Sequence, residues 1–152
     1  MSVGESMAAI PLARALNEKF KGVEILITTT TPAGAETVDR LLGDVASHVY
    51  FPYDIPFALN RFFARFRPFL LIIIETELWP NTIEFCVQRS VPVLLANARL
   101  SERSLRSYSW IRVLSREIVR SIDFIGAQTL VDRDRFIALG AVSYTHLTLP
   151  TI

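Results

Sequence analysis

Short apolar runs alternate with amphipathic segments along most of this chain. The apolar runs read as strands bounded by turn residues, and five are predicted: residues 23–28, 48–50, 70–74, 91–96 and 122–127. Between them, apolar residues recur at the spacing of one helix face. This spacing predicts helices over residues 5–20, 34–42, 57–66, 79–89, 101–120 and 130–139. About five alternations of strand and helix, without a repeat or linker, predict an α/β fold with a doubly wound parallel sheet.

Both ends of the chain depart from this alternation. The sequence opens on the first predicted helix, so the strand that would feed that helix is absent, and in the strand order 3-2-1-4-5-6 it would be central. At the other end, residues 142–152 drop the pattern, and residues 142–151 match, in one reading frame, a translated transposase sequencing adapter. We therefore expect an incomplete Rossmann-like domain at residues 1–141, lacking its first strand, and a non-native tail at residues 142–152.

The composition narrows the class of protein. Of 152 residues, 51% are hydrophobic, yet no apolar run approaches the roughly 18 residues that span a bilayer. Strands buried on both faces, as in a parallel sheet, explain this hydrophobicity, and association with a membrane surface is the other explanation. A net charge of +1 argues against a dedicated nucleic-acid binder. The single Cys86 forms neither a disulfide framework nor a cysteine metal cluster, and no metal site is expected.

Two carboxylates follow the most apolar of the predicted strands. Glu75 and Glu77 come directly after residues 69–74, and Trp79 follows them. Ligands of open parallel α/β sheets bind beyond the carboxyl ends of the strands. We expect one of these acids to face such a cleft while the other caps the helix that begins near Trp79. The alternative is that both are helix-capping acids.

Glu5 occupies a comparable place near the start of the chain, directly after Gly4. At a helix N-terminus the dipole favours an ionised carboxylate. An ionised, positioned glutamate can take the proton of a hydroxyl nucleophile. The alternative interpretation is an ordinary first-turn acid that stabilises the helix.

Three further segments carry weaker signals. The threonines of residues 28–34 precede a helix start, where backbone N–H groups can hold a phosphate, although no dinucleotide or P-loop motif occurs. Arg99 and Arg103 follow a strand and suit an anionic substrate, whereas Ser101 suits a helix N-cap. Residues 57–67 interleave phenylalanines with Arg61, Arg65 and Arg67. That pattern is typical of a membrane-surface helix, or of one core stripe with a solvated basic face.

Taken together, these stretches resemble the N-terminal half of bacterial 3-deoxy-D-manno-octulosonic acid (Kdo) transferases. The similarity keeps the family's order and spacing over essentially the whole of residues 2–141. The matching segments are residues 2–5, 9–12, 28–34, 48–50, 52–54, 75–81, 97–101 and 139–141.

The resemblance implies the N-terminal domain of a GT-B glycosyltransferase, whose active site lies between two Rossmann-like domains. It implies transfer of Kdo from CMP-Kdo to a lipid A precursor at the cytoplasmic face of the inner membrane. Glu5 would be the proton acceptor and Glu75 the transition-state stabiliser. CMP-Kdo is a donor substrate, held in a C-terminal domain that is absent here along with the family's apolar anchor, and no cofactor is implied.

Two other interpretations of function remain open at this point. One is a non-catalytic α/β domain that binds an anionic lipid or a partner through residues 57–67, and the other is a different GT-B glycosyltransferase. The sequence assigns no substrate-binding residues beyond the two acids. If the family resemblance holds, we expect the chain by itself to lack transferase activity.

Overall fold

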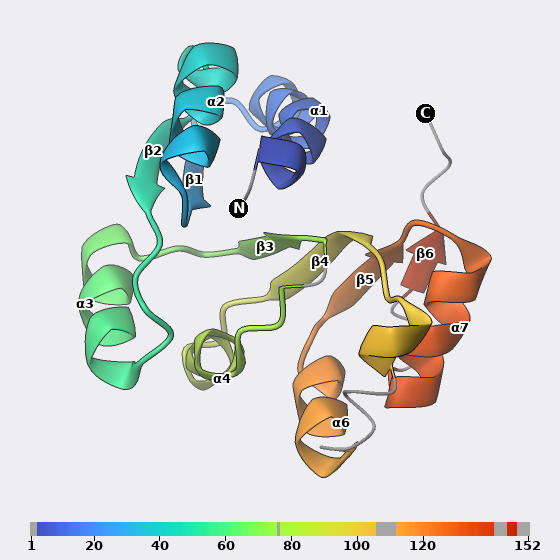
Figure 1. Cartoon of the computed structure of the whole chain (residues 1–152). Helices are drawn as coiled ribbons and strands as arrows, with labels where there is room; N and C mark the ends of the chain where they lie inside the picture. Colours follow the sequence, from blue (N-terminus) through green and yellow to red (C-terminus); the bar gives the residue numbers. More distant parts are fainter. Residues whose placement is uncertain (1–2, 76, 106–111, 142–145, 149–152) are drawn as a thin grey trace. The chain divides into compact units, whose positions relative to one another are not determined.

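The computed structural model describes residues 3–75, 77–105, 112–141 and 146–148 (Figure 1). The chain divides into two compact units, Met1–Pro52 and Tyr53–Ile152, called here the N-terminal unit and the C-terminal unit. Each unit has its own parallel sheet.

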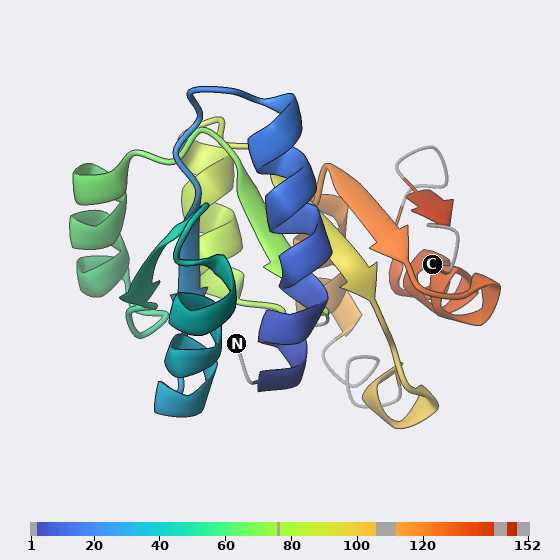
Figure 2. The same ribbon diagram turned by 90° about the horizontal axis from the view of Figure 1, so that it is seen from above.

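The N-terminal unit packs two helices against a pair of strands. Its elements are α1 (Val3–Lys19), β1 (Leu26–Thr29), α2 (Pro32–Leu42) and β2 (Ser47–Tyr50). The two strands pair in parallel, with Leu26 opposite Ser47 and Thr29 opposite Tyr50. Helix α1 continues through Pro11 without a break (Figure 2). The core of the unit is apolar and is built from Ala13, Ile27, Val38 and Leu42.

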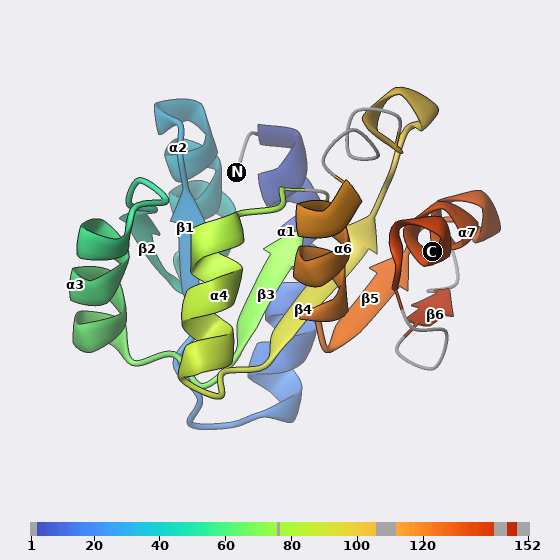
Figure 3. The same ribbon diagram turned by 90° about the horizontal axis from the view of Figure 1, so that it is seen from below.

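The C-terminal unit contains a four-stranded parallel sheet in the order β3-β4-β5-β6. Helices α4 and α6 lie side by side across one face of its strands (Figure 3). Its elements are α3 (Pro56–Phe66), β3 (Leu71–Ile74), α4 (Pro80–Gln88), β4 (Val93–Ala98), α6 (Arg112–Arg120), β5 (Phe124–Ala127), α7 (Leu130–Leu139) and β6 (His146–Thr148). The central strands supply much of the core, because Val93, Leu95, Ile125 and Ala127 are fully buried.

The predicted α/β class is confirmed, since every strand pair in the described residues is parallel. Each predicted strand is present, with shifted ends, and so are the predicted helices, of which α7 has the predicted bounds. Of the helix predicted over residues 101–120, residues 102–105 and 112–120 are helical, and residues 106–111 lie outside the described residues. Strand β1 begins at Leu26, later than expected. Helix α2 begins at Pro32, two residues before the predicted start at Gly34. Its early start follows from Pro32 at the first helical position and from the Thr31 hydroxyl, which accepts the Gly34 N–H.

Strand β6 was not expected from the sequence. His146–Thr148 pairs in parallel with β5, inside residues 142–152, which are expected to be a non-native tail. Strand pairing uses backbone groups, so an extended segment of any sequence can add to an open sheet edge. The non-native origin of residues 142–152 stays a prediction.

No helix in the described part of the chain is long and apolar enough to cross a lipid bilayer.

Candidate active site

Glu75 leaves the sheet in an unusual backbone conformation. It is the first residue after β3, and its N–H donates to the Ala96 carbonyl at 2.9 Å, so it is still tied to β4. Its φ is +63°, in the left-handed region. A non-glycine residue there costs about 1–2 kcal/mol, and such residues concentrate at functional sites because the surrounding structure must hold them.

A second left-handed residue lies beside it on the neighbouring strand. Ile74 pairs with Ala96, so Glu75 and Asn97 follow at the same level of β3 and β4. Asn97 has φ +54°. The pairing of β4 with β5 shifts register between Leu95 and Ala98, an irregularity of the kind often found next to active sites. The structure therefore brings Glu75 together with a residue that sequence reasoning did not single out.

Helix α4 begins after Glu75, and neither Glu75 nor Glu77 caps it. Trp79 occupies the N-cap position and makes no side-chain capping bond. Asp54 does the capping from 27 residues upstream: its carboxylate accepts the N–H of Asn81 at 3.1 Å and the N–H of Thr82 at 2.8 Å. The expectation that an acid of residues 75–77 caps this helix is wrong, because Asp54 already occupies its N-terminus.

The two acids after β3 consequently have different surroundings. Glu77 accepts the indole N–H of Trp79 at 3.3 Å. Glu75 is half-buried, and its carboxylate has no hydrogen bond or ion pair within the described ranges of the chain. A half-buried acid held in a strained conformation, without a structural partner there, is suited to act on a ligand.

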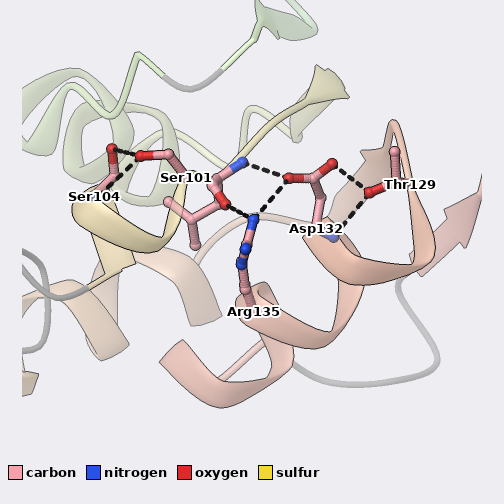
Figure 4. Close-up of polar contacts among 6 residues, drawn as sticks. Ser101, Ser104, Thr129, Asp132 and Arg135 are labelled. Atoms are coloured by element: carbon pink, nitrogen blue, oxygen red, sulfur yellow. Dashed lines mark hydrogen bonds and ion pairs between the residues drawn. The ribbon is translucent and has the colours of Figure 1, made fainter.

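The loop after β4 is fastened by α7, as Figure 4 shows. Asp132 accepts the Leu100 N–H at 2.9 Å, and Arg135 donates to the Leu100 carbonyl at 2.8 Å. Thr129 donates to the other carboxylate oxygen of Asp132 at 2.6 Å and accepts the Asp132 N–H at 3.1 Å. Both backbone groups of buried Leu100 are thus held, which fixes the path of the chain next to exposed Arg99.

The helix N-cap role expected for Ser101 is confirmed. Its hydroxyl oxygen accepts the Ser104 N–H at 3.0 Å, at the start of helical residues 102–105 (Figure 4). Arg103 is exposed. Anion binding by Arg99 or Arg103 stays a prediction.

Glu5 lies in the N-terminal unit, in the first turn of α1, where the sequence placed it, and is half-buried. Arg14 fastens this helix to the end of α2, donating to the Leu41 carbonyl at 2.8 Å and to the Asp44 carboxylate at 3.0 Å. The Arg14 hydrogen bond lowers the pKa of Asp44. This position is compatible with both interpretations of Glu5, the proton acceptor and the first-turn helix-stabilising acid.

In the threonine-rich loop of residues 28–34, the hydroxyls of Thr29 and Thr31 already make hydrogen bonds within the protein. Thr29 is buried, and its hydroxyl lies 2.9 Å from Nε2 of His48. The Thr31 oxygen serves as the cap of α2. No group of three or more potential metal ligands occurs in the described residues. The loop therefore carries no strong signal for a phosphate.

Helix α3 has both buried and exposed phenylalanines. Leu59 and Phe63 are buried, so the helix has a core stripe. Phe57, by contrast, is 72% exposed, and the guanidinium of Arg61 lies 5.8 Å from the centre of its ring. Further exposed apolar side chains occur in the sequence before the helix, at Tyr53 and Ile55, and after it, at Phe69.

Cys86 packs as a small apolar group. It lies on α4 and is fully buried. Burial raises the pKa of its thiol to about 11. A buried thiol with a raised pKa is a poor nucleophile, so Cys86 belongs to the core.

Comparison with known proteins places the chain in a family. The family described as 3-deoxy-D-manno-octulosonic-acid transferase (kdotransferase) matches residues 1–150. The chain belongs to the Kdo transferase family. It is 42% identical to the Haemophilus influenzae 3-deoxy-D-manno-octulosonic acid transferase over 91% of its own length, and 37% identical to the Bordetella pertussis enzyme over 95%. It spans only 33% and 35% of those two relatives.

Solved structures of lower sequence similarity share the fold. The UDP-GlcNAc 2-epimerase of Neisseria meningitidis, bound to UDP-GlcNAc, superposes with a TM-score of 0.66 at 15% identity, covering 97% of this chain and 44% of that one. Another UDP-N-acetylglucosamine 2-epimerase gives 0.64 at 13% identity, covering 97% and 43%. These similarities confirm the Rossmann-like α/β fold expected for the N-terminal domain of a GT-B enzyme.

Proposed function

We propose that this chain is the acceptor-side part of a glycosyltransferase that transfers Kdo from CMP-Kdo to a lipid A precursor in lipopolysaccharide core biosynthesis. Family membership supports the reaction class. The observation that best supports a catalytic role for this chain is Glu75, a half-buried acid in a left-handed conformation at a strand end. Asp54 caps α4, so Glu75 is not needed for capping.

In the proposed reaction, Glu5 takes the proton of the acceptor hydroxyl. The hydroxyl oxygen forms a bond to the anomeric carbon of Kdo while the bond from that carbon to the CMP phosphate oxygen breaks, and CMP leaves with the bonding electrons. Positive charge develops on the sugar ring as CMP departs. A preorganised carboxylate such as Glu75 stabilises that charge, directly or through a cation that it orients.

The proposal is tested in the full-length enzyme that carries this chain, by measuring transfer from CMP-Kdo to lipid A precursor. Glu5→Gln and Glu75→Gln keep the size of each side chain and remove its charge. For Glu5→Gln we expect kcat to fall about 100-fold or more, because amide cannot accept the proton. We expect a fall of the same order for Glu75→Gln.

Glu77→Gln is the matched control. Its amide oxygen still accepts the Trp79 indole N–H, so the same loop loses one charge while keeping this contact. Its kcat should stay within a factor of about two. A near-normal kcat for Glu5→Gln would leave Glu5 as a helix-stabilising acid, and a near-normal kcat for Glu75→Gln would remove Glu75 from the mechanism.

We also propose that the enzyme works at the cytoplasmic face of the inner membrane and contacts that surface through α3. The exposed Phe57 ring and the exposed Arg61, Arg65 and Arg67 support this assignment. Aromatic side chains insert at the lipid interface. Arginines near an anionic leaflet contribute about 1 kcal/mol each.

Vesicle binding tests this placement. Cosedimentation with vesicles that contain anionic phospholipid should weaken at least about fivefold in Phe57→Ser/Arg61→Gln, and binding to purely zwitterionic vesicles should be weaker for both proteins. Val87→Ser, which removes a 52% exposed apolar side chain on α4, serves as the control and should bind as the parent does. Equal binding by the α3 variant and the control would contradict the assignment.

A further inference from the structure

We infer that Asp54 is a positioning residue for Glu75 in the reaction proposed above, on which this inference rests. Asp54 gives the first turn of α4 four hydrogen bonds. Besides the two backbone N–H groups, its carboxylate accepts the Thr82 hydroxyl at 2.7 Å, and its own carbonyl accepts the Asn81 side-chain amide at 2.7 Å. Thr82 is buried, so water does not readily replace these bonds.

The loop that carries Glu75 is attached at two points. At its beginning, the Glu75 N–H is bonded to Ala96 in the ladder between β3 and β4. At its end, the chain enters α4 at Pro80, directly after a residue that makes no side-chain cap. The bonds from Asp54 therefore fasten the second attachment point.

Asp54 affects the reaction through this second attachment. The Glu75 carboxylate has no partner in the described residues to fix its direction. Its direction then depends on the backbone, whose left-handed conformation is strained and must be held from both ends. A displacement of about 1 Å in a reacting group can cost up to about 100-fold in rate.

A purely structural role for Asp54 would give a different result, and the chain provides a control for it. Asp123 also uses a carboxylate oxygen to accept a distant backbone N–H, that of Val93 at 2.8 Å. Val93 is the first residue of β4, at the opposite end of that strand from Asn97. Asp123→Asn therefore removes the charge of a comparable capping carboxylate away from Glu75, while its amide oxygen can still accept the Val93 N–H.

The experiment compares steady-state kinetics of the full-length enzyme and four variants: Asp54→Asn, Asp123→Asn, Glu75→Gln and the Asp54→Asn/Glu75→Gln double variant. Assays are run well below each melting temperature. For Asp54→Asn we expect kcat to fall about 10-fold, with KM for CMP-Kdo changed less than about twofold, and for Asp123→Asn an unchanged kcat. In the Glu75→Gln background, Asp54→Asn should change kcat less than about twofold, because residues that act through each other are not additive.

Three results would overturn the inference. One is a kcat for Asp54→Asn no lower than that of Asp123→Asn. Another is an equal loss from Asp54→Asn with and without the Glu75 carboxylate, which would mean that Asp54 acts elsewhere. The third is a normal kcat for Glu75→Gln alone, which refutes the proposed role of Glu75 and the inference with it, so the two failures are distinguishable.

A milder variant serves if Asp54→Asn does not fold. Thr82→Val removes only the 2.7 Å hydroxyl bond to Asp54 and leaves the charge in place. It should lower kcat about two- to fivefold in the parent and leave it unchanged in the Glu75→Gln background. An unchanged kcat for Thr82→Val in the parent would count against the inference.

Discussion

The loops after β3 and β4 leave neighbouring parallel strands at the same end of the sheet, and each is fastened by an aspartate from elsewhere in the chain. For the loop after β3 this is Asp54, which precedes its partner Asn81 by 27 residues. For the loop after β4 it is Asp132, which follows its partner Leu100 by 32 residues. Each strand end also has a non-glycine residue with positive φ, Glu75 directly after β3 and Asn97 at the second-to-last position of β4.

The difference lies in where each aspartate attaches. Asp132 and Arg135 hold the backbone of the loop itself, at Leu100, and Asp132 is only 8% exposed. Asp54 is half-buried and holds the helix that follows the loop. The first arrangement fixes a loop residue directly. The second fixes the far end of the loop and leaves the Glu75 side chain available to a ligand.

The largest effect should come from removing the buried aspartate. Asp132→Ala leaves the Leu100 N–H buried without a partner and removes the acceptor of the Thr129 hydroxyl. We expect the free energy of unfolding to fall by about 3 kcal/mol, against about 2 kcal/mol for Asp54→Ala, whose site water can enter more easily. Chemical denaturation followed by circular dichroism measures both. A smaller loss for Asp132→Ala than for Asp54→Ala would reverse the comparison.

The sequence predicts local features of these loops well. Helix α7 has the predicted bounds, because its N-cap is Thr129 and its C-cap is Gly140, with φ +112°. Both are signals that a local sequence pattern contains. Thr129 and Asp132 also have the spacing of a capping box, a signal that marks Asp132 without reference to the structure. The position of Glu75 follows from the apolar run before it.

Contacts between distant residues lie beyond such patterns. The capping of α4 by Asp54 joins segments 27 residues apart, and local rules instead favoured the nearer acids, Glu75 and Glu77. The left-handed conformation of Asn97 coincides with the register shift of β4 against β5. The only local hint is that asparagine adopts this conformation more readily than most residues. Strand β6 depends on the open edge of β5, which no periodicity in residues 142–152 reveals.

The smallest effects on the free energy of unfolding should come from glycine substitutions of the two left-handed residues. These substitutions distinguish backbone strain that is kept for function from strain that the residue tolerates easily. Glycine adopts positive φ without a steric penalty. Glu75→Gly therefore relieves about 1–2 kcal/mol of conformational cost, part of which is offset because glycine gains about 0.4–1 kcal/mol of entropy in the unfolded chain. We expect a net rise of about 0.5 kcal/mol in the free energy of unfolding, together with the loss of activity expected for Glu75→Gln.

Asn97→Gly is the matched control, on the adjacent strand at the same level. Asparagine tolerates positive φ, so little strain is available to relieve, and the entropy that glycine gains in the unfolded chain should lower the free energy of unfolding by about 0.4–1 kcal/mol. Chemical denaturation of both variants measures the contrast. If Glu75→Gly instead destabilised the protein by about 1 kcal/mol or more, the carboxylate would be making a stabilising contact. The conformation of Glu75 would then be explained by stability alone, and the difference between the two loops would give no evidence for a catalytic role of Glu75.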